Sequence, residues 1–195
     1  FKEQWVMRIR DKIKKPQRPV DAYEILPPRE KDGTLNSYAE TISSLLSQTH
    51  IDAINIPEVH DEVGRGERPV SNQERGEPRK FGMLLQDIVG IEAIVNRVVV
   101  HMPLKKQMEW IEETYSQYEI DNLIIVGGES SKQQYPGPTV NESLEKISQE
   151  NRLRKNSILC GGICIPSRKK ESKNLIRKSE CGAEFFTTQV LCDSG

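Results

Sequence analysis

The stretch "AIVNRVVVHMPLKKQMEWIEETYSQYEIDNLIIVGG" (residues 93–128) decides the fold of this 195-residue chain. Two short apolar runs, 93–100 and 122–128, enclose a segment in which Met108, Ile111 and Tyr115 recur at helical spacing. An apolar run, a helix and a second apolar run are typical of two parallel strands joined by a right-handed crossover. Both runs are nearly continuous in apolar residues, so we expect helices to cover this sheet.

The same unit repeats along the chain. Apolar runs predict six strands, at 22–26, 52–57, 93–100, 122–128, 158–166 and 184–191, and helical patterns lie at 36–48, 80–89, 104–118, 139–153 and 171–182. Thr139 and Glu142 match a capping box, and Gly182 matches a helix end. An open doubly wound sheet and a (β/α)8 TIM barrel both fit this order. No Gly-x-Gly-x-x-Gly follows the first strand, which weakens the first option.

We therefore predict an α/β fold, an incomplete (β/α)8 TIM barrel with about six β/α units, and we expect the missing units beyond residue 195. Residues 1–20 form a basic helical lead-in, and residues 21–195 form the partial barrel domain. The basic residues Lys12, Lys14, Lys15 and Arg18 are interpreted as a solvated helix end rather than a phosphate-binding arm. A polar loop insertion at about 58–80 is either an exposed insertion or a loop that orders over a substrate.

Composition excludes several classes of protein. The chain is 35% hydrophobic and 29% charged, with a mean hydropathy of -0.61 and a formal net charge of -1, which argues against a broad nucleic-acid interface. No apolar run approaches the roughly 20 residues needed to cross a bilayer. The four cysteines fall in the last quarter, and the spacing of Cys160 and Cys164 is not that of a zinc site. We expect reduced thiols, no metal and a cytoplasmic location.

Polar residues interrupt the apolar runs near the carboxyl ends of several predicted strands. Glu24 lies between Tyr23 and Ile25, Glu129 follows two glycines, and Gln189 lies within the sixth run, after two threonines. Barrels assemble their active sites at this end of the strands. Each residue also has a structural explanation, such as an ion pair of Glu24 with Arg29 or a turn capped by Glu129. The pattern by itself predicts an α/β protein with a polar-lined cleft.

Four stretches resemble one known family. They are "YEILPPRE" (23–30), "IIVGGES" (124–130), "YPGPTVNES" (135–143) and the segment from "GGICIPSR" (161–168) to "GAEFFTTQ" (182–189). Together they resemble the methylenetetrahydrofolate reductases, flavin-dependent (β/α)8 barrels, in the same order along residues 21–193. The resemblance implies reduction of 5,10-methylenetetrahydrofolate to 5-methyltetrahydrofolate, with FAD as cofactor and NADH or NADPH as the reductant.

The resemblance also implies roles for individual residues. Glu24 matches the general acid that protonates N10 of the folate, and burial among apolar neighbours would favour its neutral form. Glu129 and Gln189 match residues that bind the pterin of the substrate. The positions that match flavin contacts are Gly128, Glu129, Asn174, Arg177 and Lys178.

Some positions depart from the family pattern. Gly127 stands where an arginine often contacts flavin, Ile165 replaces an aromatic residue, and the loop after Pro166 is short. These departures motivate an alternative, a folate-binding or partner-docking barrel subunit without independent flavin chemistry. The expected partners are a folate and a nicotinamide cofactor, without nucleic acid or membrane. A homo-oligomer and a redox partner subunit both stay open.

Overall fold

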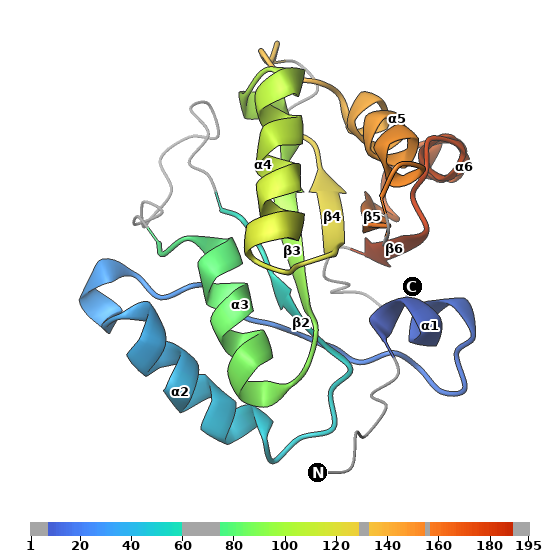
Figure 1. The fold of residues 1–195 in the computed structure, drawn as a ribbon. Coiled ribbons are helices and arrows are strands. Elements are labelled where there is room, and N and C mark those ends of the chain that lie inside the picture. The colour runs from blue at the N-terminus through green and yellow to red at the C-terminus, as the bar shows by residue number, and fades with distance from the viewer. Residues whose placement is uncertain (1–7, 60–74, 129–132, 155–156, 189–195) are drawn as a thin grey trace.

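The computed structural model describes residues 8–59, 75–128, 133–154 and 157–188 (Figure 1). The strands are β1 (Ala22–Glu24), β2 (Ala53–Ile56), β3 (Ala93–Val98), β4 (Asn122–Val126), β5 (Leu159–Cys164) and β6 (Phe185–Thr188). The α-helices are α1 (Ile9–Lys14), α2 (Leu35–Leu46), α3 (Pro78–Val89), α4 (Leu104–Gln117), α5 (Val140–Asn151) and α6 (Glu171–Glu180). Two 3-10 turns, Glu30–Asp32 and Val99–His101, complete these elements. The predicted alternation of strands and helices is confirmed.

The sheet is parallel throughout, and its strand order is β1-β2-β3-β4-β5-β6. Helices α2 to α5 pack on one face, where Leu46, Phe81, Ile111 and Leu144 share one apolar cluster with strand residues such as Val95. A doubly wound sheet reverses its strand order and has helices on both faces. Sequential order with one helical layer is instead that of a curled half-barrel, consistent with the predicted incomplete barrel.

Side chains of the opposite face, here called the inner face, form two layers. The lower layer, at the amino ends of the strands, is apolar and contains Ala53, Ile94, Ile124, Leu159 and Phe185. Two residues further along the strands, alternation brings Asn55 and Asn96 to the same face. The register pairs Glu24 with Asn55, so the upper layer is polar at β1 to β3. This division places polar groups where a barrel builds its site.

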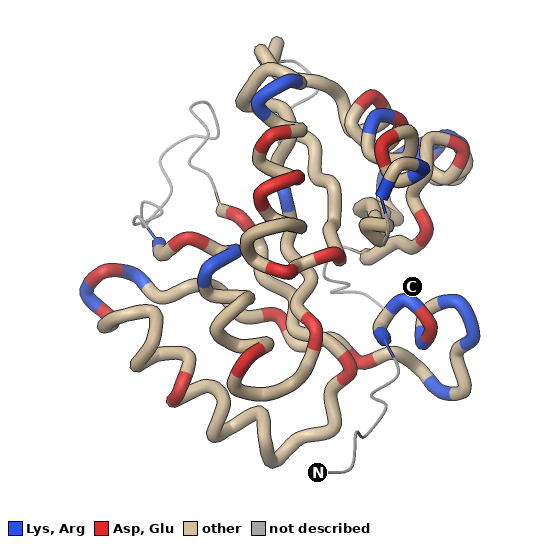
Figure 2. The backbone as a smooth tube through the Cα atoms, in the orientation of Figure 1, with Lys and Arg blue, Asp and Glu red and all other residues tan. Residues whose placement is uncertain are grey.

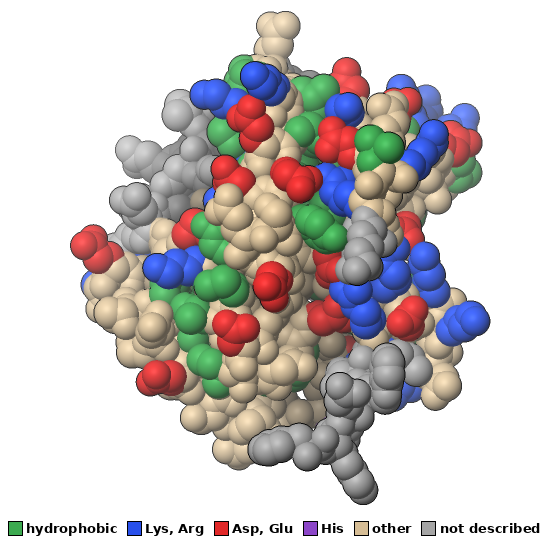
Figure 3. Space-filling model, viewed as in Figure 1, with side chains coloured by type: hydrophobic (Ala, Val, Ile, Leu, Met, Phe, Trp, Pro, Cys, Tyr) green, Lys and Arg blue, Asp and Glu red, His purple; other side chains and the backbone are tan. Residues whose placement is uncertain are grey.

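Helix α1 covers the lower layer (Figure 1). Ile9, which is buried, and Ile13 pack into the apolar cluster of the inner face. Lysine and arginine follow one another along α1 and its loop (Figure 2), and they gather at the right of the surface view (Figure 3). Thr139 and Glu142 close the predicted capping box of α5, and Gly182 adopts a positive φ of 115° after α6. Both predictions of helix ends are confirmed.

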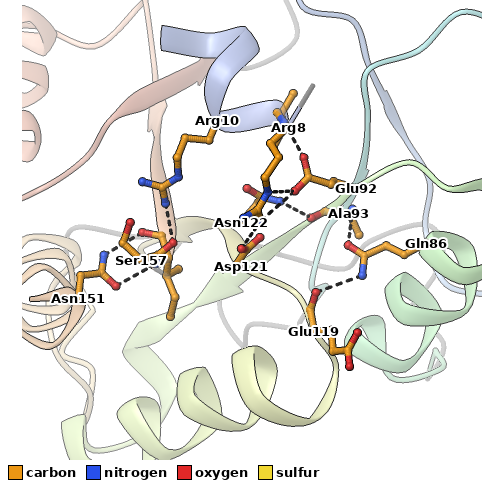
Figure 4. Close-up of polar contacts among 12 residues, drawn as sticks. Arg8, Arg10, Gln86, Glu92, Ala93, Glu119, Asp121, Asn122, Asn151 and Ser157 are labelled. Carbon is orange, nitrogen blue, oxygen red and sulfur yellow. Dashed lines mark hydrogen bonds and ion pairs between the residues drawn. The ribbon is translucent and has the colours of Figure 1, made fainter. Parts of the chain in front are cut away.

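The basic residues of α1 bind acids that precede the strands. Arg8 pairs with Glu92 at 3.1 Å and also with Asp121, while Arg10 donates to the carbonyl of Ser157 at 2.6 Å (Figure 4). Lys14 pairs with Glu184 at 3.0 Å. Each of these partners lies one or two residues before a strand, so α1 ties β3, β4, β5 and β6 together.

The ion pairs of Lys12 and Arg18 correct the interpretation of the basic segment. Both side chains bind the buried carboxylate of Asp52, at 2.9 and 2.8 Å, and Asp52 also accepts the backbone N–H of Asp21. They therefore do not form a simple solvated helix end. Of the polar loop predicted at 58–80, residues 60–74 lie outside the described residues, and its end is helical because α3 begins at Pro78.

Candidate functional site

A cavity of about 610 Å³ lies at the carboxyl ends of the central strands. Strands β3, β4 and β5 contribute the wall that includes Asn96, Val126 and Ile163, and α6 contributes a basic wall. Four of the predicted cofactor positions line this one cavity: Gly128, Asn174, Arg177 and Lys178. Residues from separate parts of the sequence thus meet at the edge of the sheet where parallel α/β folds bind ligands.

A buried carboxylate organises the basic wall. Glu171, the first residue of α6, accepts hydrogen bonds from Asn174 Nδ2 and from the backbone N–H of Ile165, both at 3.0 Å. Lys178 and Arg168 approach the same carboxylate at 3.8 and 3.6 Å. Burial opposes ionisation, but these hydrogen bonds and cations together lower the pKa of Glu171. The sequence analysis missed Glu171, although its spacing of three and seven residues from Asn174 and Lys178 places all three on one helical face.

The ammonium group of Lys178 is partly withdrawn from solvent. Its Nζ donates to the carbonyl oxygen of Ile163, and burial lowers its pKa although Glu171 opposes that change. Arg177 is exposed and lines the same cavity. The basic wall therefore offers one partly buried ammonium group and one exposed guanidinium group to a ligand anion.

A second carboxylate, Glu58, lines the cavity from the loop after β2. It accepts hydrogen bonds from the buried guanidinium of Arg97 and, at 2.8 Å, from the backbone N–H of Val98. Arg97 also donates to Gln107 at 2.8 Å and lies over the ring of Trp110, 4.2 Å from its centroid. The β3 arginine thereby fixes the position of Glu58. Sequence analysis placed Glu58 in a polar loop and gave no signal that a strand arginine would hold it.

The glycines of the site make room for aromatic rings of the chain itself. A Cβ atom at Gly128 would lie 2.2 Å from Tyr135 Cζ, and one at Gly161 would lie 2.4 Å from Phe185 Cζ. Their open sides are occupied by Tyr135 and Phe185, so close packing within the protein is sufficient reason for glycine at both positions.

The predicted burial of Glu24 is wrong. All three residues of β1 are exposed, because β1 is an edge strand whose described hydrogen-bonding neighbour is β2 alone. Glu24 lines a different cavity, of about 400 Å³, together with Arg29, Asp32 and Arg75. Its carboxylate accepts a hydrogen bond from Asn55 Nδ2 at 2.9 Å. The side chain of Glu24 is therefore open to solvent, not enclosed by its apolar sequence neighbours.

Two predicted residues, Glu129 and Gln189, lie outside the described residues. Their sequence neighbours lie at the carboxyl edge of the sheet, since Gly128 follows β4 and Thr188 is the last residue of β6. The cavity lined by Gly128 is at this edge. The structure thus brings four of the seven predicted residues into one cavity, Glu24 into another, and leaves the remaining two as predictions.

No family model and no curated protein matches the chain. Among solved structures, an uncharacterized protein from Clostridium thermocellum that binds two copies of 5-methyl-5,6,7,8-tetrahydrofolic acid is similar, with a TM-score of 0.71 and 18% identity. The similarity covers 94% of this chain and 59% of that one, so the chain spans 59% of its neighbour's length. The shared feature is the fold.

A mandelate oxidase variant with benzaldehyde also matches, with a TM-score of 0.45 and 10% identity, over 88% of this chain and 49% of that one. A TM-score of 0.45 is too low to assign a property of that enzyme to this chain. Across the described residues, no helix has the length and apolar character needed to span a membrane.

Proposed function

We propose that the chain binds a reduced folate at the carboxyl edge of its half-barrel and acts there as a methylenetetrahydrofolate reductase-like oxidoreductase. The observation that carries this proposal is the cavity that Gly128, Asn174, Arg177 and Lys178 share. Those residues were predicted from sequence stretches that resemble the reductases. The similarity in fold to a protein that binds 5-methyltetrahydrofolate supports a folate as the ligand.

The polar groups at α6 fit a flavin nucleotide. Arg177 and Lys178 provide positive charge for phosphate oxygens. The buried carboxylate of Glu171 holds Asn174 and Lys178 in place behind that wall. A bound FAD would supply the hydride that reduces the folate, and NADH or NADPH would restore the reduced flavin. The residues of the chain hold the two ligands and supply a proton.

Glu24 is the proposed source of that proton. Protonation of N10 of 5,10-methylenetetrahydrofolate opens the five-membered ring and leaves an iminium carbon that accepts hydride. The carboxyl group lies on the inner face, in register with Asn55 of β2, and β2 in turn pairs with β3, which carries Asn96. Glu129 and Gln189 are the proposed contacts of the pterin ring.

Substitution of Glu24 by glutamine separates the two half-reactions. Glu24→Gln removes the proton but keeps the size of the side chain, so methylenetetrahydrofolate turnover should fall by roughly a hundredfold or more. Reduction of the flavin by NADH or NADPH should stay within about twofold of wild type. Stopped-flow absorbance in the flavin bands measures both steps. An equal loss in both would show that Glu24 supports the structure instead.

Substitution of Arg177 tests whether FAD binds in this cavity, and substitution of Lys173 is the matched control. Both are exposed basic residues of α6, but only Arg177 lines the cavity. Arg177→Ala should weaken FAD binding by about tenfold, whereas Lys173→Ala should leave it unchanged, as measured by fluorescence titration of FAD. Equal affinities in both variants would remove Arg177 from the site.

The alternative is a folate-binding or partner-docking subunit without independent flavin chemistry. The exposure of Glu24 and the filling of the space beside Gly128 by Tyr135 favour it. This alternative predicts that 5-methyltetrahydrofolate binds, as calorimetry would detect, while added FAD gives no change in fluorescence. Binding of both ligands would favour the reductase.

A further inference from the structure

Of the two polar atoms of the Asn55 amide, the nitrogen makes a described hydrogen bond and the oxygen makes none. Its Nδ2 donates to Glu24 Oε2 at 2.9 Å, across neighbouring strands whose register places the two residues side by side. Its Oδ1 is buried, and no described group donates a hydrogen bond to it. A buried acceptor without a donor is unfavourable, so this oxygen favours any state of the site that brings it a proton.

A carboxylic acid and a primary amide can form two hydrogen bonds at once. The amide N–H donates to one carboxyl oxygen, and the hydroxyl on the other oxygen donates to the amide carbonyl. An ionised Glu24 makes the first bond only, because its carboxylate has no hydrogen to give. A protonated Glu24 has the hydroxyl that the second bond requires, and that bond would give the buried Oδ1 of Asn55 its donor.

We propose that Asn55 is the positioning residue that holds the proton of Glu24 in a two-hydrogen-bond ring with the amide. Its role as a proton holder for folate reduction rests on the proposed function. The arrangement supplies what burial does not, since Glu24 is exposed. It also directs the acidic hydrogen to one carboxyl oxygen, which fixes the orientation of the acid on the inner face.

The cationic residues near Glu24 are bound to other groups, so Asn55 is the described side chain that binds its carboxylate. Of the residues that line its cavity, Arg29 is bound to Asp32 at 2.7 Å, and Arg75 donates to the carbonyl of Pro27 at 2.9 Å. Both cations thus have partners other than Glu24. On the inner face, the residues beside it on β2 and β3 are neutral amides.

The test is a titration of the Glu24 carboxyl carbon by NMR, in the whole chain labelled with ¹³C-glutamate. The signal is assigned by its loss in Glu24→Gln. In Asn55→Ala the acid loses two hydrogen bonds and the carboxylate loses one, so the midpoint should move to lower pH by about half to one unit. Asn55→Ser should move it in the same direction, and circular dichroism checks that both variants fold.

Asn96→Ala is the matched control, because Asn96 shares the inner face but makes no described bond to Glu24. Its midpoint should equal that of wild type. A midpoint in Asn55→Ala that is unchanged or moves to higher pH would overturn the proposal, because a simple donor to the carboxylate acts in that opposite direction.

The titration needs no turnover, so it is independent of the proposed function. A downward shift in a protein that neither binds nor reduces folates would support the hydrogen-bond ring and refute the reductase. In an active protein, the pH at which turnover falls to half should move down with the NMR midpoint in Asn55→Ala. Turnover that keeps its wild-type pH dependence would remove Asn55 from the proton-transfer step.

Discussion

Cys160 shows how strongly its surroundings change the chemistry of one side chain. It lies in β5 among residues of the helix-covered face, and burial raises the pKa of its thiol to about 12. The nearby carboxylate of Glu184 acts in the same direction, while Arg10 and Arg154 oppose it. At pH 8 almost none of this thiol is therefore ionised, and the thiolate is the reactive form.

We therefore predict that Cys160 stays unmodified when the native protein is treated with a thiol reagent at pH 8. Cys164 and Cys181 are less buried and should react first. Peptide mass spectrometry measures each site, and the same reaction in guanidinium chloride should label all four cysteines of the chain, including Cys192, which lies outside the described residues. Rapid native labelling of Cys160 would contradict the burial described here.

Residue-scale prediction from sequence agreed with the structure where a side chain's position depends on local spacing and failed where it depends on neighbouring strands. Asn174, Arg177 and Lys178 meet at one cavity because helical periodicity alone puts them near each other. Glu24 was expected to be buried because its sequence neighbours are apolar. Its exposure depends instead on its strand position at the sheet edge, which the sequence pattern does not encode.

At the scale of elements, α1 acts through its contacts with strand beginnings. Asp21, Asp52, Glu92, Asp121 and Glu184 each stand directly before a strand, and each binds a basic residue of the segment 8–18. In the sequence, an acidic residue stands directly before, or at the first position of, each of five apolar runs. This signal was missed because the basic segment and the acids are far apart in the chain and no local pattern pairs them.

Asp52 tests this arrangement. Burial raises the pKa of Asp52. The hydrogen bond from Asp21 N–H and the cations Lys12 and Arg18 together lower that pKa by more than burial raises it, so the net shift is downward. A lowered folded-state pKa means that the carboxylate stabilises the fold above its ordinary value of 3.8, and that this contribution disappears as the pH falls through the folded-state value.

We expect Asp52→Asn to lower the free energy of unfolding at pH 7 by about 2 kcal/mol, as urea denaturation measures. Between pH 4 and pH 2 the wild type should lose stability faster than the variant, so the two curves approach each other. The exposed Asp21 is the control, and Asp21→Asn should change stability by less than about 0.5 kcal/mol. Parallel curves for Asp52→Asn and wild type would refute the linkage.

At the scale of the whole molecule, periodicity predicted the architecture well because each strand–helix unit is local and repeated. The six strands, their parallel direction and the single helical layer all follow from that repetition. The two layers of the inner face did not follow, because they depend on register between strands. Among the described strands, β1 and β6 each pair with one neighbour, and Tyr23 of β1 is 54% exposed.

An edge strand with an exposed aromatic residue favours association between sheets. We predict that the 195-residue chain self-associates as its concentration rises, and that Tyr23→Lys shifts the species towards monomer in sedimentation velocity. Leu45 is the matched control, because it is 60% exposed but lies on a helix, α2, whose backbone cannot pair with a second sheet. Leu45→Lys should leave the distribution unchanged. A monomeric wild type at high concentration would contradict the prediction.

The division of the inner face into an apolar lower layer and a polar upper layer has a consequence for engineering. Because α1 and its apolar contacts fix the strands from below, a designer can exchange upper-layer side chains such as Asn96 while leaving the foundation of the fold intact. Specificity for a new compound should therefore be attainable by substituting residues of the upper layer alone.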